Sequence, residues 1–468
     1  MILNKSAVVA SSILLVREKS QYYRCCTTLN RAVFLVGSVT SIRNMSQQSI
    51  KEKFRLPARL EGSKKSMWTE YIELAIKHKP LDLGQGFCDY PVPSYITDAY
   101  TNAAKNDHLL HQYTRGFGHL RLVQAISKLY SNLVNRPIDF RNEVLISSGA
   151  YQAIYTVIHG HVDVGDEVII VEPFFDCYEP MVKMAGGIPR FIPLKPKTSS
   201  VTSTADWVLD VDELENIFSN KTKMFILNNP NNPLGKVFTV NELKKIAELC
   251  IKYNVLCLSD EVYEWITYDG NEMIRMCTLD GMWERTITVG SAGKTFSTTG
   301  WKIGWSFGPE NLMTNMQMVH QNSVYTCSTP IQEALAIAFE TELLRLGTNE
   351  CYFNALPQEL QKKRDFTAAF LRDIGMNVIN PQGGYFLMAD WSSLADKSDL
   401  TTESDTHRDY RFTKWMIKNI GIQGIPPSAF YADGHKHLGE NYVRYCFFKN
   451  DDYLQKCADL LNKWKHNF

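Results

Sequence analysis

Short apolar segments alternate with amphipathic ones along most of the chain, and this pattern restricts the fold more than any other feature. Apolar residues recur at helical spacing over 120–134 and 241–254, whereas 166–173, 223–230 and 255–261 read as strands. Short apolar strands separated by amphipathic helices predict an α/β fold with a mainly parallel sheet. In such sheets ligands bind at the carboxyl ends of the strands, so polar residues that directly follow a strand are candidate site residues.

Small or polar residues follow several predicted strands. ISSGAYQA has Gly149 and Ala150 after one strand, FILNNPNNPLG has Asn232 after another, and LCLSDEVY has Asp260 and Tyr263 after a third. The loop in SAGKTFSTTGWKIGW follows the strand TITVGS. Because all these strand ends are expected at one edge of the sheet, their side chains are expected to converge on one cleft.

Lys294 lies in that loop among small and hydroxylated residues, without a neighbouring carboxylate. A solvated surface lysine is the ordinary interpretation of such a loop. The alternative is a nucleophile that forms an imine with the aldehyde of pyridoxal phosphate. The choice between these two interpretations depends on whether the sequence also offers the residues that bind the other groups of that cofactor.

Candidates for a phosphate site and for an acid at the pyridine nitrogen are present. Gly149 and Ala150 at a helix start, with Ser291 and Lys302, offer N–H groups, a hydroxyl and a cation, although a tight turn and a surface charge are the commoner uses. Asp260 ends an apolar strand, where an unpaired carboxylate is costly. A protonated pyridine nitrogen would pair with it, and a helix N-cap is the alternative role.

Further candidates concern the ring and the substrate. Asn232 and Tyr263 are candidates for contact with the phenolic oxygen of the cofactor. The alternative role of Asn232 is in a proline-rich turn, and that of Tyr263 is simple packing. Phe175, in EPFFDCYEP, either lies on the ring face or belongs to the core. Arg444, in YVRYCF, either binds a substrate carboxylate through two parallel hydrogen bonds or forms a structural salt bridge.

Taken together, these motifs resemble those of the fold-type I, class I/II pyridoxal-phosphate aminotransferases, in the same order and at similar separations. The resemblance runs from about KFRLP at residue 53 to the C-terminus. It is greatest with the kynurenine aminotransferase branch, also called glutamine transaminase K or cysteine-S-conjugate β-lyase. The stretches that carry this finer resemblance are LGQGFCDYPVP, HQYTRGFG, DGMWERT and MVHQNSVYTC.

The resemblance implies a role for each matched residue. Lys294 is the lysine that carries pyridoxal phosphate as an imine, and Asp260 pairs with the pyridine nitrogen. The cofactor is further held by Gly149, Ala150, Tyr151, Phe175, Asn232, Tyr263, Ser291 and Lys302, and by Tyr113 of a neighbouring subunit in a homodimer. The substrate is bound by Arg444 and Asn232 at its α-carboxylate, by the backbone of Gly86, and by Trp68, Tyr151 and His320 around its side chain.

The implied fold has a large cofactor-binding domain over 90–345 with a mostly parallel mixed sheet between helices. A smaller α+β domain combines 51–89 with 346–468, where a long helix precedes the strand YFLMADW. Two departures from the family pattern are Cys88, where relatives usually have proline, and Asn229, where threonine is common. The loss of proline at Cys88 frees the turn beside Gly86.

The first fifty residues differ in composition from the rest. Six Lys and Arg residues stand against one acid, Glu18, with many Ser and Thr, which favours a mitochondrial transit peptide over a secretory signal. The 11 cysteines lack disulfide or zinc spacing and favour an intracellular protein. Met45 is a candidate start for a cytosolic form. The numbers of basic and acidic residues are equal, 50 each, which does not favour nucleic acid as a partner. The sequence has no long apolar run, which does not favour a membrane.

The expected activity is transfer of the amino group of L-kynurenine, glutamine or other aromatic or apolar amino acids to a 2-oxo acid. Kynurenine would yield kynurenic acid, and β-elimination from cysteine S-conjugates is an expected side activity. The alternatives are an aminotransferase of alanine or aspartate type and a catalytically silent scaffold of the same fold. Aspartate specificity requires a second cation for the side-chain carboxylate, which the matched segments do not offer.

Overall fold

The computed structural model describes residues 50, 52–61, 66–198 and 201–466. Its chain divides into two compact units, 1–58 and 59–468. In the first unit, the N–H of Phe54 donates to the carbonyl of Ile50 at 3.0 Å. The predicted targeting segment, with Met45, lies outside the described residues except for Ile50. None of the helices in the described part of the chain is long and apolar enough to cross a membrane.

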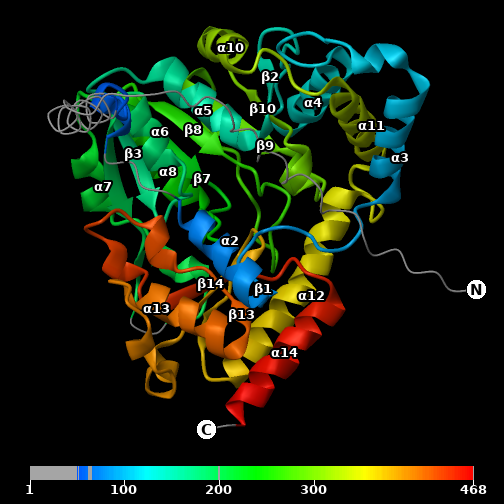
Figure 1. Cartoon of the computed structure of the whole chain (residues 1–468). Helices are drawn as coiled ribbons and strands as arrows, with labels where there is room; N and C mark the ends of the chain where they lie inside the picture. Colours follow the sequence, from blue (N-terminus) through cyan, green and yellow to red (C-terminus); the bar gives the residue numbers. More distant parts are fainter. Residues whose placement is uncertain (1–49, 51, 62–65, 199–200, 467–468) are drawn as a thin grey trace, which may run out of the picture. The chain divides into compact units, whose positions relative to one another are not determined.

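The second unit contains a seven-stranded sheet (Figure 1). All of its strands run in the same direction except β10, which is antiparallel to both of its neighbours. The predicted α/β fold with a mostly parallel mixed sheet is confirmed, although β10 itself was not predicted as a strand. The order across the sheet is β2 (Val144–Ser147), β10 (Gly304–Phe307), β9 (Thr286–Ser291), β8 (Leu256–Asp260), β7 (Thr222–Asn228), β3 (Glu167–Glu172) and β4 (Ile188–Pro193).

Both faces of this sheet are buried, as β3 illustrates. Val168 and Ile170 belong to one hydrophobic cluster, and Ile169 and Val171 belong to another. Because successive side chains of a strand point to opposite faces, a continuous apolar run suits a sheet covered on both sides. The first cluster includes residues of α5 (Gly149–His161), α6 (Tyr178–Met184) and α10 (Glu310–Ser323), and the second includes residues of α7 (Val211–Ile217) and α8 (Val240–Lys252).

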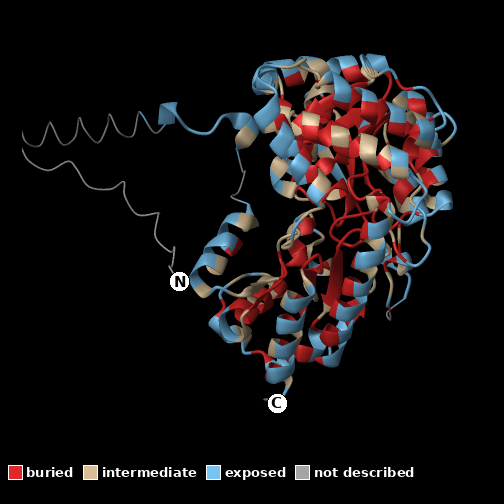
Figure 2. Ribbon diagram, turned by 90° about the vertical axis from the view of Figure 1, so that its right-hand side faces the viewer, coloured by how far each residue is buried: buried red, intermediate tan, exposed pale blue. Residues whose placement is uncertain are grey.

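The helices follow the amphipathic segments of the sequence. Helix α8 begins after a capping box, in which the Thr239 hydroxyl accepts from the Glu242 N–H and the Glu242 carboxylate accepts from the Thr239 N–H. In Figure 2 such helices are buried on one side and exposed on the other. The other α-helices in the described stretches between residues 66 and 346 are α2 (Met67–His78), α3 (Ser94–Asn106), α4 (Leu120–Leu133), α9 (Ala292–Thr295) and α11 (Thr329–Arg345).

The C-terminal part forms a smaller antiparallel sheet of β11 (Asn377–Ile379), β12 (Phe386–Asp390) and β14 (Tyr442–Cys446), in that order. The long helix α12 (Tyr352–Asp373) packs against α14 (Asp451–Lys465) (Figure 1), and α13 spans Arg408–Trp415. A parallel pair, β1 (Leu81–Asp82) and β13 (Ile422–Gln423), joins the segment before residue 90 to the C-terminal part. The domain boundaries at 89/90 and 345/346 stay a prediction.

Candidate active site

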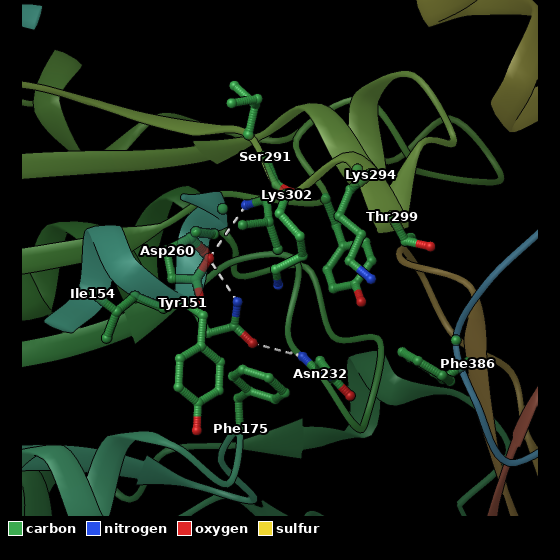
Figure 3. Close-up of a pocket in the computed structure, with 18 of the residues that line it drawn as sticks. Tyr151, Ile154, Phe175, Asn232, Asp260, Ser291, Lys294, Thr299, Lys302 and Phe386 are labelled. Carbon is green, nitrogen blue, oxygen red and sulfur yellow. Dashed lines mark hydrogen bonds between the residues drawn. The ribbon is translucent and has the colours of Figure 1, made fainter. Parts of the chain in front are cut away.

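A cavity of about 310 Å³ lies where β2, β3, β7, β8 and β9 end (Figure 3). The fold brings all the predicted site residues to this cavity except Tyr113 and His320. Residues from the N-terminal and C-terminal segments complete the lining. It consists of Trp68, Gly86, Gly149, Ala150, Tyr151, Ile154, Phe175, Asn228, Asn232, Asp260, Val262, Tyr263, Ser291, Gly293, Lys294, Thr299, Lys302, Ile303, Phe386 and Arg444.

Lys294 extends into this cavity from the short helix α9, directly after β9. Its ammonium group donates a hydrogen bond to the hydroxyl of Tyr385. Burial lowers the pKa of Lys294 to about 8, and the positive charges of Arg444 and Lys302 act in the same direction. A substantial fraction of the amine is therefore neutral near pH 8, which is the form that acts as a nucleophile or base.

Asp260, the last residue of β8, is 3% exposed. Its carboxylate accepts a hydrogen bond from the Tyr178 hydroxyl and one from the Val262 N–H at 3.4 Å. Burial raises the pKa of Asp260 to about 6, with the Lys294 charge acting against this shift. The carboxylate thus lines the cavity at an energetic cost that a cationic ligand group would offset.

A cluster of donors suited to an anion lies around the N-terminus of α5. Gly149 begins the helix with φ at +77°, and Ser291 and Lys302 line the cavity as well. A Cβ built on Gly149 would lie 3.3 Å from Nζ of Lys302, and one on Gly304 would lie 2.5 Å from the backbone nitrogen of Ala150. Helix N–H groups, a hydroxyl and an ammonium group together form an environment that favours a phosphate.

Arg444 is a buried cation whose observed hydrogen bonds go to neutral oxygens. Nη1 donates to Oδ1 of Asn232 at 3.0 Å, and Nη2 donates to the carbonyl of Gly84 at 3.0 Å. Its Nε is buried without a partner, and burial lowers its pKa to about 10. A guanidinium group in this state is suited to a carboxylate ligand, which would supply the missing charge-assisted bonds.

Aromatic side chains form the walls. The ring of Phe175 meets that of Tyr151 edge-on at 6.1 Å between centroids. The indole N–H of Trp68 donates to Oδ2 of Asp176 at 2.9 Å, which fixes the orientation of the indole. Tyr263 is 2% exposed, and its ring packs edge-on against Tyr385 at 5.1 Å. These walls favour a planar ligand and apolar substrate groups.

His320, which was predicted to line the substrate pocket, is not among the residues that line this cavity. His320 is fully buried in α10, where one ring nitrogen bonds the carbonyl of Gly116 at 3.0 Å and the other bonds the amide of Gln152 at 3.3 Å. Both ring nitrogens are thus used in packing α10 against its neighbours. Tyr113 also lies outside the cavity and is 84% exposed, with its ring edge-on to that of Tyr325 at 5.9 Å.

Several residues that support the site were not predicted. Asn228 donates to the backbone carbonyl of Asp260 at 3.0 Å and accepts from the N–H of Asn232 at 2.7 Å (Figure 3), so it joins two strand ends. A polar residue at the end of an apolar strand was the available signal for it. Tyr178 and Tyr385 gave none, because tyrosine is common in a core and only the fold brings these hydroxyls to Asp260 and Lys294.

Fold and site together define an aminotransferase scaffold, and the chain belongs to the class I and II aminotransferases, whose family model matches residues 78–461. Kynurenine–oxoglutarate transaminase 3 of Mus musculus is 51% identical over 415 residues, covering 88% of this chain and 90% of the mouse protein. Kynurenine–oxoglutarate transaminase 1 of Homo sapiens is 46% identical over 411 residues, covering 87% of this chain and 97% of the human protein. The crystal structure of Bna3p from Saccharomyces cerevisiae matches with a TM-score of 0.81 at 32% identity, covering 87% and 97%.

Proposed function

We propose that this protein is a pyridoxal-phosphate-dependent aminotransferase that moves the amino group of L-kynurenine to a 2-oxo acid and so forms kynurenic acid. Glutamine and other aromatic or apolar amino acids are further donors. One observation carries the proposal: Lys294, Asp260 and Arg444 line one cavity, each with the charge or donor set that this reaction requires. The names of the mouse and human relatives support the choice of kynurenine.

The donor set fits the cofactor. The α5 N-terminus, Ser291 and Lys302 would hold the phosphate, and Asp260 would pair with the protonated pyridine nitrogen. Asn232 accepts from Arg444 through Oδ1, which leaves its amide N–H groups to donate to the phenolic oxygen beside Tyr263. When bound, pyridoxal phosphate supplies an electron-accepting ring that stabilises the electron pair of the broken Cα–H bond.

The residues of the chain then have distinct tasks. Arg444 binds the α-carboxylate and thereby orients the Cα–H bond of the donor. The neutral amine of Lys294 would take the Cα proton onto Nζ and later release it, while the amino group of the donor would stay with the cofactor when the first 2-oxo acid leaves. A second 2-oxo acid reverses these steps. Loss of a β-substituent after the same proton abstraction would give the cysteine-S-conjugate β-lyase side activity.

Donor preference follows from the walls of the cavity. Trp68, Tyr151 and Phe175 suit aromatic or long apolar side chains. The basic residues that line the cavity are Lys294, Lys302 and Arg444, which all have tasks already, so a second cation for an aspartate side chain is missing from the lining. This observation disfavours aspartate specificity. An alanine-type donor or a silent scaffold would be revealed by the experiment below.

We further propose a homodimer in which Tyr113 completes the neighbouring site. Its exposure of 84%, beside exposed Tyr325, supports a contact with another chain. We also propose mitochondrial import of the full-length chain, from its Arg-rich and acid-poor first fifty residues, and a cytosolic form that begins at Met45. Fluorescent fusions of both forms test these two proposals, and a cytosolic full-length protein would refute mitochondrial import.

The visible absorbance of purified protein supplied with pyridoxal phosphate tests the main proposal. We expect a yellow band that fades when kynurenine is added without a 2-oxo acid, and that returns when a 2-oxo acid follows. Lys294→Ala should remain folded but neither form the band nor turn over. A band that fades with glutamine or alanine but not with kynurenine would show that glutamine or alanine, and not kynurenine, is the amino donor. If no band forms in the wild type, the silent scaffold is favoured.

A further inference from the structure

The hydroxyl of Tyr385 connects the amine of Lys294 to the segment around Gly86. It accepts a hydrogen bond from Nζ of Lys294 and donates to the carbonyl oxygen of Gly86 at 3.0 Å. Tyr385 is fully buried directly before β12, and its ring packs against Tyr263 at 5.1 Å and Phe386 at 4.9 Å. The hydroxyl of Tyr263 is a further hydrogen-bonding neighbour of the Tyr385 hydroxyl.

The close approach of Gly86 maintains this arrangement. A Cβ on Gly86 would lie 2.4 Å from Cζ of Phe386 and 2.8 Å from Cε2 of Tyr385, which is closer than side-chain contacts allow. The backbone of Gly86 can lie on the tyrosine ring because it has no side chain. Its carbonyl oxygen is thereby held within reach of the Tyr385 hydroxyl and accepts its proton in a hydrogen bond.

The bond to Tyr385 determines how the amine is held. Nζ of Lys294 donates to the oxygen of Tyr385, and the hydroxyl proton of Tyr385 is directed away from the amine, to the carbonyl oxygen of Gly86. An N–H bond of the amine then points at Tyr385, and the lone pair of the neutral amine is directed elsewhere. When the amine takes a proton, the same oxygen stabilises the ammonium group through a charge-assisted hydrogen bond.

We propose that Tyr385 is a positioning residue that orients the free amine of Lys294 for proton transfer and stabilises its protonated form. This inference rests on the proposed aminotransferase function. During proton transfer the Cα–H bond of the substrate breaks and an N–H bond forms at Nζ, while the Tyr385 hydroxyl keeps its own proton, which it donates in a hydrogen bond to the carbonyl oxygen of Gly86. A purely structural tyrosine would fill the same volume without an effect on the ionisation of Lys294.

Tyr385→Phe tests the proposal because it removes only the hydroxyl. Tyr268→Phe is a matched control, since Tyr268 is also a buried tyrosine whose hydroxyl donates to a glycine carbonyl, that of Gly384, with no contact to Lys294. Full-length enzyme is held with excess donor and no 2-oxo acid, so that Lys294 is a free amine. Potassium cyanate, which modifies neutral amines, is then applied across a range of pH, and modification at Lys294 is measured by peptide mass spectrometry.

Three effects are expected in Tyr385→Phe. The midpoint pH of Lys294 modification falls by about one unit, because the ammonium group loses a charge-assisted acceptor. Turnover falls by about tenfold with little change in KM, and the kinetic isotope effect with Cα-deuterated donor rises, because proton transfer becomes slower. Tyr268→Phe should match the wild type in all three measurements. A difluorotyrosine at position 385, a weaker acceptor, should shift the midpoint in the same direction by less.

The opposite sign would overturn the proposal. If Tyr385 only fills space, the phenylalanine ring fills it as well and the midpoint does not move. A midpoint that rises toward the ordinary lysine value of 10.5 would likewise contradict the proposal. A wild-type enzyme whose absorbance does not respond to any donor would refute the proposed function itself. A responsive wild type with an unshifted Tyr385→Phe variant would refute only the role of Tyr385.

Discussion

Nη1 of Arg444 donates to Oδ1 of Asn232 at 3.0 Å across a sequence separation of 212 residues. The bond joins β14 of the C-terminal sheet to the loop after β7 of the large sheet. One residue is predicted to bind the substrate carboxylate and the other the phenolic oxygen of the cofactor. A substrate carboxylate that engages Arg444 would therefore also affect the amide beside the ring.

Arg444→Lys should raise KM for the amino donor by at least tenfold. Lysine keeps the charge but loses the planar fork that forms two parallel bonds to a carboxylate, and such bonds contribute about 2 kcal/mol or more. Steady-state kinetics with kynurenine and with glutamine provide the measurement. Arg364→Lys is the control, because Arg364 pairs with Asp269 and Asp365 and does not line the cavity. An unchanged KM in Arg444→Lys would contradict the assignment.

Asp260→Asn should stabilise the cofactor-free protein while it weakens cofactor binding. Burial raises the pKa of Asp260 from 3.8 to about 6, so the carboxylate opposes folding above pH 6, and this cost disappears below 3.8, where the carboxyl is protonated in both states. Two pKa units correspond to about 3 kcal/mol, of which we expect about 2 kcal/mol to be regained by the neutral amide at pH 7.5.

Urea denaturation of the Asp260→Asn variant, with and without pyridoxal phosphate, measures both effects. Asp409→Asn serves as the control, because burial raises the pKa of Asp409 to about 6 as well, but Asp409 does not line the cavity. The change in stability of the Asp409 variant should therefore be the same with and without pyridoxal phosphate. A loss of stability in cofactor-free Asp260→Asn would show that the buried charge of Asp260 does not destabilise the cofactor-free protein.

The capture of pyridoxal phosphate should depend on pH with a midpoint near 8. The neutral amine of Lys294 is the reacting form, and its pKa is lowered to about 8, so the rate of imine formation should rise with pH up to that value and then level off. Stopped-flow absorbance on mixing cofactor-free protein with pyridoxal phosphate measures this rate. A rate that still increases tenfold per pH unit above pH 9 would indicate an ordinary exposed lysine.

His320→Ala should reduce stability without changing donor preference. The ring bonds the carbonyl of Gly116 and the amide of Gln152 in a fully buried position, so its removal should cost about 2 kcal/mol. The ratio of kcat/KM for kynurenine to that for glutamine should stay constant in this variant and change in Trp68→Phe, because Trp68 lines the cavity. A changed ratio in His320→Ala would indicate that His320 contacts the substrate after all.

Much of the fold follows from local patterns in the sequence. The strand TITVGS coincides with β9, and the amphipathic run 120–134 corresponds to α4, because apolar periodicity reports directly on burial. Lys294, Asp260 and Asn232 were found because each follows a strand, and the ends of parallel strands meet at one edge. Strand β10 was missed, since Gly304 and its neighbours follow a glycine-rich and hydroxyl-rich loop that obscures the pattern.

Only the tertiary structure decided which side chains meet across distant segments. Tyr385 reaches Lys294, Tyr178 reaches Asp260, and His320 bonds to the α10 surroundings rather than to the cavity. Local periodicity carries no information on these contacts, because they depend on how the C-terminal sheet and the helices pack against the strand ends. The sequence by itself determined the sheet and the chemical types at its edge. The packing set the ionisation of those groups, since burial and neighbouring charges shift the pKa values of Lys294 and Asp260.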